Sequence, residues 1–283
     1  MSRAGSSALG SRARRAMLVG ALAVSALLVS GCTANEAFFF DLPEPATEEG
    51  PIMQSLWNGS WIAAWAVGIV TWALMIWAAI AYRRRHKDDV PEQTKYNIPL
   101  EILYTVVPLV MILGLFYFTA RDQAEILAVS DDQDHTVNVV GYRWSWGFNY
   151  LDEDVYDSGM PIGEGADLNI PTLVLPVDEK VRFELTSPDV IHSFWVPDFL
   201  FKMDVIPGKT NVFELTPNKL GTFAGKCAEL CGVDHSRMLF QVKVVERSEY
   251  DSYIQSLRDR GQTGLLRSNQ VTDSGQMPDE RTT

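Results

Sequence analysis

The chain has 283 residues, of which 47% are hydrophobic, and its 36 acidic side chains outnumber 24 basic ones, for a formal net charge of −12. Nucleic acid is not expected as a partner, because phosphate backbones bind basic surfaces. The apolar residues are concentrated in three blocks with the charges between them, so each block needs its own explanation.

The first block predicts a signal peptide over residues 1–31. Four arginines precede the apolar run 17–29, which ends in small residues directly before Cys32. A basic region, a short apolar core and small residues are typical of a secretory leader. The junction looks like a bacterial lipobox, which would place the cleavage before Cys32 and a diacyl lipid on its sulfur. The alternative is an ordinary signal peptide followed by an incidental cysteine.

The other two blocks predict transmembrane helices over residues 61–82 and 98–118. The first is 22 residues without a charge, and the second contains one acid, Glu101, and one proline, Pro108. At 1.5 Å per residue each is long enough to cross the hydrocarbon core of about 30 Å. A proline is tolerated in such a helix where neighbouring groups satisfy the freed carbonyl.

Flanking charges predict the orientation of this hairpin. Residues 33–60 contain no Lys or Arg, whereas the connection 83–97 begins with Arg-Arg-Arg-His-Lys. The positive-inside rule therefore makes 83–97 a cytoplasmic loop. Both the segment 32–60 and everything after residue 118 are then expected outside a bacterial cell membrane, with two spanning helices and both termini extracytoplasmic.

The pattern after about Asp131 predicts an all-β domain over residues 119–247. Short β-rich runs separated by turn signals are typical of a sandwich or barrel. The expected strands are Thr136–Gly141, Thr172–Pro176, Lys180–Thr186, Asn211–Thr216, Gly221–Lys226 and Leu239–Val245. Residues 248–283 are expected to start with a short helix, Tyr250–Asp259, and to continue as a polar, partly disordered tail.

One short segment concentrates the residues that carry chemistry. Cys227, Cys231, His235 and Met238 lie within twelve residues, between two expected strands. Thiolate, thioether and imidazole ligands together select copper over hard cations. The segment has one thiol more and one histidine fewer than a single blue-copper ion needs.

The missing imidazole is expected from His192. Only four histidines are present, of which His86 falls in the cytoplasmic loop and His135 in an acidic stretch. Two thiols and two imidazoles suit two copper ions bridged by both thiolates better than one ion with a spare thiol. The alternatives are a Cys227–Cys231 disulfide and a structural zinc site of two cysteines and two histidines, which gives Met238 no role.

The C-x-E-x-C-x-x-x-H-x-x-M spacing and the two-helix hairpin resemble subunit II of haem–copper cytochrome c oxidases over about residues 50–250. The resemblance implies a cupredoxin-like domain with the dinuclear copper centre called CuA. Its implied copper ligands are His192, Cys227, the backbone carbonyl of Glu229, Cys231, His235 and Met238. The Glu229 side chain would also reach a magnesium ion at the interface with the catalytic subunit; alternatively it is a solvated loop acid.

Two further residues acquire roles through this resemblance. In the aromatic stretch 141–150, Trp144 is implied as the point where electrons enter, although Tyr142 and Ser145 depart from the common family pattern. Trp144, Trp146, Phe148 and Tyr150 would share one strand face, most of them in the core. Glu101 is implied as a proton-entry residue; alternatively it reaches the nearby interface.

The implied function is electron input to a respiratory oxidase. Electrons would pass from cytochrome c to haem in the catalytic subunit I, and the complex would reduce oxygen to water and pump protons. No C-x-x-C-H haem motif occurs in this chain. Alternatives are a copper-lacking quinol-oxidase subunit and a membrane-tethered copper chaperone. The donor cytochrome c is expected to be either soluble or membrane-bound within a respiratory supercomplex. A basic soluble donor would be attracted by nearby acids: Asp152, Glu153, Asp154, Asp157, Glu164 and Asp167.

Overall fold

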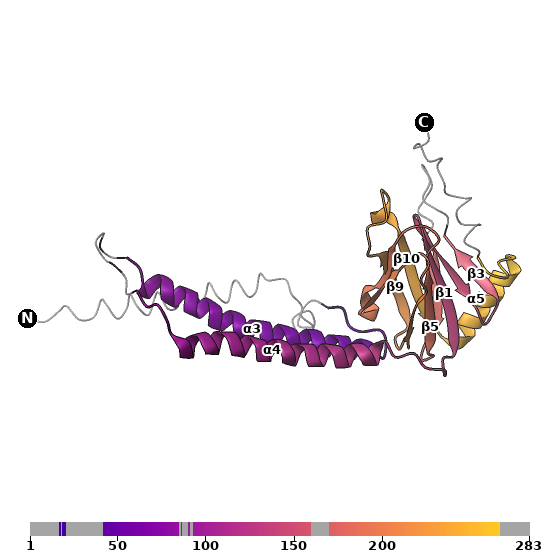
Figure 1. Cartoon of the computed structure of the whole chain (residues 1–283). Coiled ribbons are helices and arrows are strands. Elements are labelled where there is room, and N and C mark those ends of the chain that lie inside the picture. Colours follow the sequence, from indigo (N-terminus) through magenta and orange to yellow (C-terminus); the bar gives the residue numbers. More distant parts are fainter. Residues whose placement is uncertain are drawn as a thin grey trace, which may run out of the picture. The chain divides into compact units, whose positions relative to one another are not determined.

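The computed structural model describes residues 42–84, 86, 90, 93–159 and 170–266, together with residues 17, 19 and 20. Cys32, nearly all of the expected signal peptide, Glu164, Asp167 and the tail after residue 266 lie outside these residues. Figure 1 shows a pair of long helices and a β-domain that carries one further helix, α5.

The two long helices are α3, Gly50–Ala81, and α4, Ile98–Ile126, and they contact each other. Both are long and apolar enough to cross a membrane. α3 begins eleven residues before the expected span, because the helix also includes residues 50–60, where uncharged polar side chains interrupt the apolar run. Thr47 Oγ1 accepts a hydrogen bond from the Gly50 N–H and so satisfies one free donor of its first turn.

The β-domain is a sandwich of two five-stranded sheets, ordered β3-β2-β1-β5-β8 and β4-β10-β9-β6-β7. Neighbouring strands are antiparallel except for the parallel pairs β1–β5 and β4–β10. The strands are β1 His135–Tyr142, β2 Ser145–Tyr150, β3 Val155–Ser158, β4 Thr172–Pro176, β5 Val181–Thr186, β6 His192–Val196, β7 Phe201–Val205, β8 Asn211–Leu215, β9 Gly221–Cys227 and β10 Leu239–Val245. The all-β prediction is confirmed, and all six expected strands are present with bounds that differ by at most one residue at either end.

Stacked aromatic rings fill the space between the sheets. Phe194 of β6 stacks on Phe240 of β10 with ring centroids 4.8 Å apart, and Trp146 of β2 packs at 5.1 Å from Phe240. Gly225 makes room for this cluster, since a Cβ there would lie 2.2 Å from the Phe240 ring. β6 and β9 are paired at only two positions, Phe194 with Cys227 and Trp195 with Lys226.

The segment after β10 contains the expected short helix. Helix α5, Arg247–Asp259, buries Tyr250, Ile254 and Leu257 against the domain. The chain then returns to β3, where Thr263 forms a bridge with Val155. The expected helix Tyr250–Asp259 is therefore present and begins three residues earlier, at Arg247, while most of the polar tail expected after it lies outside the described residues.

Candidate metal centre

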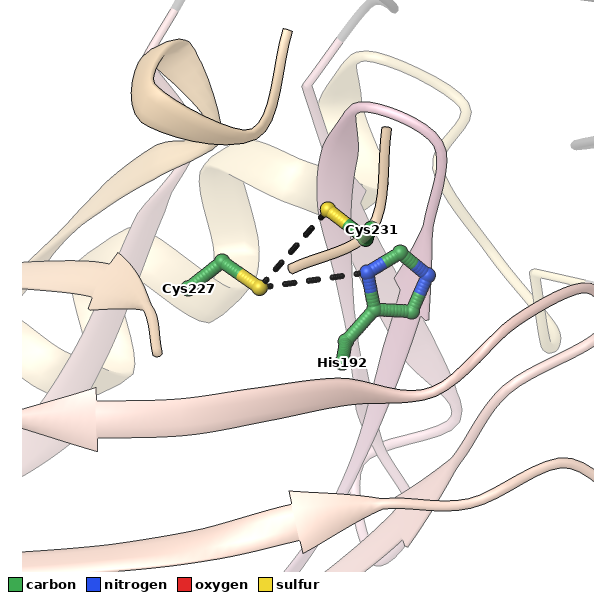
Figure 2. Close-up of side chains that lie close together, drawn as sticks. All are labelled: His192, Cys227 and Cys231. Atoms are coloured by element: carbon green, nitrogen blue, oxygen red, sulfur yellow. Dashed lines mark hydrogen bonds between the residues drawn. The ribbon is translucent and has the colours of Figure 1, made fainter. Parts of the chain in front are cut away.

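Two segments that are distant in sequence bring the predicted ligands together. His192 is the first residue of β6, and the loop 227–238 connects β9 to β10. Because Phe194 pairs with Cys227, the start of β6 lies beside the end of β9. Figure 2 shows His192, Cys227 and Cys231 facing one another from these segments.

The two thiols occupy the middle of the cluster. The sulfur atoms of Cys227 and Cys231 are 3.9 Å apart. Cys227 Sγ lies 3.9 Å from His192 Nδ1 and 3.2 Å from the Glu229 carbonyl oxygen. All three distances are longer than covalent bonds, so these atoms are close enough to be ligands of a common metal ion without being bonded to one another.

The second thiol has a matching pair of neighbours. Cys231 Sγ lies 3.5 Å from His235 Nδ1 and 3.7 Å from Met238 Sδ. Each sulfur thus has one imidazole nitrogen and one weaker donor close by. The structure therefore brings together all six residues predicted as copper ligands.

The disulfide alternative does not agree with this geometry. Both cysteines are free, and their sulfurs are separated by almost twice the bond length of about 2.05 Å. Both cysteines are also buried, and His192 and Met238 have no solvent-exposed surface (0%). A cluster of soft donors shielded from water suits a soft metal ion.

Asp189 orients the His192 ring, and sequence reasoning missed it. Its Oδ1 lies 2.9 Å from His192 Nε2. An Nε2–H donated to this carboxylate leaves the Nδ1 lone pair directed at Cys227. The signal in the sequence was an acid three residues before the histidine, within a Ser-Pro-Asp turn.

The same carboxylate also binds backbone groups. Its Oδ2 accepts the Arg143 N–H at 2.8 Å, and its Oδ1 accepts the Val190 N–H at 2.6 Å. Burial alone would raise the pKa of Asp189, but the hydrogen bonds to His192, Arg143 and Val190 outweigh it and lower the pKa to about 2. Asp189 is therefore ionised at neutral pH.

The metal-free thiols share a proton. The hydrogen bond between them is the largest cause that lowers the pKa of Cys227, and the same contact raises the pKa of Cys231. Burial would lower the pKa of His192, but hydrogen bonds to Asp189 and Cys227 raise it. Since a metal binds deprotonated ligands, loading this centre releases protons.

Trp144 contacts the metal loop through its indole. It is half-buried in the turn between β1 and β2, and its Nε1–H donates to the Cys231 carbonyl oxygen at 3.2 Å. Gly232 lies under the ring, where a Cβ would come within 3.1 Å of the indole. The expectation that Trp144 shares a strand face with Trp146 is wrong, because β2 begins only at Ser145.

The remaining aromatic residues of this stretch form part of the core, as expected. Trp146, Phe148 and Tyr150 are fully buried. Tyr142, which departs from the common family pattern, is buried in a separate small cluster with Val140 and donates from its hydroxyl to the Gly159 carbonyl oxygen at 2.6 Å. The departure at Tyr142 therefore lies inside the domain rather than on its surface.

Three of the acids expected to attract a donor, Asp152, Glu153 and Asp154, lie away from the metal loop. β1 runs from His135 to Tyr142 and pairs antiparallel with β2, so residues 151–154 lie beside His135, roughly 20 Å along the strand from the Trp144 turn. Glu153 is also engaged, because it binds His135 at 3.1 Å and the Tyr250 hydroxyl at 2.9 Å. Proximity in the sequence gave no information about which end of the hairpin these acids occupy.

Glu101 has a structural contact at the start of α4. The Asn97 side chain accepts a hydrogen bond from the Leu100 N–H at 3.3 Å, and Glu101 Oε1 accepts one from the Asn97 N–H at 3.0 Å. This reciprocal arrangement caps the helix. Any further role of Glu101 has to be compatible with this contact.

The family profile and the related sequences that match this chain all carry the same description. The family profile described as "Cytochrome C oxidase subunit II, periplasmic domain" matches residues 135–245. The chain is 48% identical to a probable cytochrome c oxidase subunit 2 of Streptomyces avermitilis, with 94% of each chain covered. It is 35% identical to cytochrome c oxidase subunit 2 of Mycobacterium tuberculosis, with 86% of this chain and 81% of that protein covered.

A solved structure of the same kind also matches. The periplasmic domain of subunit II of cytochrome oxidase (CoxB) of Bradyrhizobium japonicum is 32% identical, with a TM-score of 0.43. The match covers 47% of this chain and 99% of that one. The two apolar helices, the cupredoxin-like sandwich and the 48% identity over nearly the whole chain agree, and the protein belongs to the cytochrome c oxidase subunit II family.

Proposed function

We propose that this chain is the electron-input subunit of a respiratory terminal oxidase. It accepts single electrons from a cytochrome c at a dinuclear copper centre and passes them to haem in the catalytic subunit I. Reduction of oxygen to water and proton pumping belong to the assembled complex. The observation that carries this proposal is the pair of facing thiols, each with its own imidazole nitrogen and weaker donor.

The donor set fits two copper ions better than one ion of any kind. Cys227 and Cys231 would bridge, His192 and His235 would each supply one nitrogen, and the Met238 thioether and Glu229 carbonyl would be weak ligands. Copper held there would supply a one-electron couple delocalised over two ions. A single tetrahedral zinc would leave Met238, which lies 3.7 Å from Cys231 Sγ, without a role.

The surrounding residues prepare the centre for electron transfer. Asp189 fixes the His192 tautomer, and burial of the sulfurs excludes water. Trp144 is the proposed entry point, since its hydrogen bond to the Cys231 carbonyl joins a half-buried ring to a ligand residue. The exposed side chain of Glu229 is proposed to reach a magnesium ion at the interface with the catalytic subunit.

The membrane segments anchor the subunit, and we propose their orientation from charge. The loop 83–97 would be cytoplasmic and the β-domain extracytoplasmic in a bacterial cell membrane. Cys32 would carry a lipid after removal of residues 1–31. Glu101, near the cytoplasmic end of α4, is proposed as a proton-entry residue in addition to capping the helix.

Metal content and spectroscopy of the full-length chain in detergent test the central proposal. We expect two copper ions per chain and an electron paramagnetic resonance spectrum of one unpaired electron shared between two nuclei. Cys231→Ser should lose this signature, whereas replacement of the exposed Asp204 by Asn should retain it. One copper per chain, or a preference for zinc, would contradict the dinuclear centre.

Two rival functions predict other outcomes. A copper-lacking quinol-oxidase subunit would bind no copper, although its architecture would be the same. A copper chaperone would bind one ion reversibly and would not copurify with a haem-containing subunit. Glu101→Gln keeps an acceptor for the Asn97 N–H but cannot carry a proton, so slower oxygen uptake by the assembled complex with α4 intact would support proton entry.

A further inference from the structure

A second cluster of imidazole and carboxylate groups lies at the start of strand β1, away from the metal loop. His135 is the first residue of β1, and Asp152 and Glu153 belong to the turn after β2. Because Val137 pairs with Tyr150 in the antiparallel β1–β2 hairpin, this turn returns to the start of β1. The ligand atoms of His135, Asp152 and Glu153 lie within 4.8 Å of one another. We call these three residues the His135 cluster; the proposed copper site uses none of them.

The histidine is buried, and its two ring nitrogens face different carboxylates. Its exposed fraction is 4%. Nε2 lies 2.8 Å from Glu179 Oε2, and Nδ1 lies 3.1 Å from Glu153 Oε1. Arg247 Nη1 is closer to Glu179 Oε2, at 2.6 Å, than to His135 Nε2, at 3.3 Å, so Arg247 donates to the carboxylate. An Nε2–H donated to Glu179 leaves the Nδ1 lone pair directed at Glu153, which is how a carboxylate orients an imidazole ligand in metal sites.

Glu153 has a buried oxygen that the described part of the chain leaves without a donor. Its Oε1 accepts a hydrogen bond from the Tyr250 hydroxyl at 2.9 Å. Its Oε2 is buried and has no hydrogen-bond partner among the described residues. A buried polar atom without a partner costs free energy. A cation bound beside Glu153 would remove this cost.

The charges of the cluster are suited to a divalent cation. Asp152 and Glu153 carry two negative charges, while the charge of Glu179 is balanced by Arg247 at 2.6 Å. Arg258 donates to the backbone carbonyl of Glu153 at 2.9 Å and not to its carboxylate. A divalent ion therefore balances the two carboxylates when the imidazole is neutral. Where no ion is bound, a proton on the imidazole supplies one of these positive charges.

The donor set indicates which ion fits. One imidazole nitrogen with carboxylate oxygens is typical of Zn²⁺, whereas Ca²⁺ takes six to eight oxygens and Mg²⁺ keeps near-ideal octahedral oxygen geometry. Bonds of about 2.0–2.1 Å in a tetrahedral site separate two ligand atoms by about 3.3 Å. The distance of 3.1 Å between His135 Nδ1 and Glu153 Oε1 is close to that value. Asp152 is exposed, and its Oδ2 is held by the Thr136 N–H at 2.6 Å, so an ion can reach this side chain from solvent.

We propose that the His135 cluster binds one Zn²⁺ ion, separate from the copper centre, that stabilises the docking of helix α5. The first turn of α5 is held by groups that the ion would fix in place. Tyr250 donates to the ligand Glu153, and Arg247 pairs with Glu179, the carboxylate partner of the ligand His135. The inference does not depend on the proposed function, because no residue of the cluster is a copper ligand.

Calorimetric titration of Zn²⁺ into the full-length chain in detergent tests the inference. Copper is loaded first and weakly bound copper is removed with a chelating resin, so that the 227–238 loop is already occupied. We expect one Zn²⁺ per chain, and Mg²⁺ at the same concentration should not compete. Zn²⁺ should also slow amide hydrogen exchange of residues 247–254 by about tenfold, because the start of α5 becomes more firmly attached.

Matched variants separate a metal site from a general effect of surface charge. Asp152→Asn removes an exposed ligand and should raise the Kd for Zn²⁺ by about tenfold or more, at least as much as loss of an outer partner of a metal ligand. Glu153→Gln should have the same effect. Asp154→Asn is the control, since Asp154 is an exposed acid of the same turn outside the cluster. Its φ of 54° suits asparagine, so the fold should be retained and the Kd unchanged.

Three results would overturn the inference. The first is a copper-loaded chain that binds no Zn²⁺, which would leave His135 as part of an ion-pair network only. The second is the same Kd in Asp152→Asn, Glu153→Gln and the wild-type chain, which would locate any bound Zn²⁺ elsewhere, including the 227–238 loop. The third is an equal loss of affinity in Asp154→Asn, which would mean that Zn²⁺ responds only to the negative charge of the turn.

Discussion

Asp189 offers a sharp test of how the metal centre is held. Asp189→Asn keeps the shape of the side chain but removes its charge. The carboxylate accepts hydrogen bonds from His192, Arg143 and Val190. A hydrogen bond to a charged group contributes about 1.5–3 kcal/mol and a neutral one about 1 kcal/mol, so the substitution should weaken the contact with His192 by about 1–2 kcal/mol.

That loss should be measurable in three ways on the full-length chain. Copper affinity should fall by about 5–30-fold, which corresponds to about 1–2 kcal/mol. The reduction potential should rise by roughly 40–90 mV, because a negative charge that favours the oxidised centre is removed and about 59 mV corresponds to a tenfold change for one electron. The His192 ring should also lose its fixed tautomer in nitrogen NMR spectra of the metal-free chain.

The exposed Asp204 provides the control, since Asp204→Asn removes the same charge from another position of the β-domain. It should leave the copper affinity and potential unchanged. Equal copper affinity and an equal potential in Asp189→Asn and the wild-type chain would refute the reasoning that this carboxylate orients His192.

Three further predictions concern electron entry, pH dependence and packing. Trp144→Phe keeps the copper spectrum but lacks the indole N–H, so stopped-flow reduction by cytochrome should slow by about tenfold or more. Burial would lower the pKa of His135, but hydrogen bonds to Glu153 and Glu179 raise it above 6.5. The stabilisation of the fold by protonated His135 is therefore complete below pH 6.5 and is lost as the pH rises through the raised pKa. His135→Gln should lower Tm more at about pH 6 than at about pH 9, and an equal drop at both pH values would contradict this. Gly225→Ala would drive a methyl group into the Phe240 ring and should cost about 1–3 kcal/mol in chemical denaturation, whereas Gly59→Ala, with no atom within 4 Å, should cost nothing.

The fold was predictable where the sequence pattern is local. β4 and β10 coincide with their expected bounds, because each is a short, largely apolar run that contains β-branched residues. β6 and β7 were not on the expected strand list. β6 reads His-Ser-Phe-Trp-Val with no polar alternation, and a short helix at Pro197–Phe199 separates it from β7. The pairing of β6 with β9 is a long-range contact that no local pattern encodes.

The residues of the candidate site were likewise predictable where the pattern is local and not where it depends on long-range contacts. The spacing of Cys227, Cys231, His235 and Met238 pointed to soft-metal chemistry because all four lie in one loop. His192 followed only because so few histidines were available. The role of Asp189 depends on the turn before β6 folding back onto the ring, and it could not be inferred from spacing alone.

The short pairing between β6 and β9 gives the metal centre a mechanical consequence. Only two residue pairs join these strands, and one of them includes Cys227. Metal ions bound by both His192 and the 227–238 loop would cross-link β6 to β9, the strand pair of the second sheet with the fewest paired residues. Such a cross-link closes a loop of the chain much as a disulfide does. Loading should therefore slow amide hydrogen exchange along β6 and the end of β9, while β4, at the opposite edge of the same sheet, exchanges at the same rate as before.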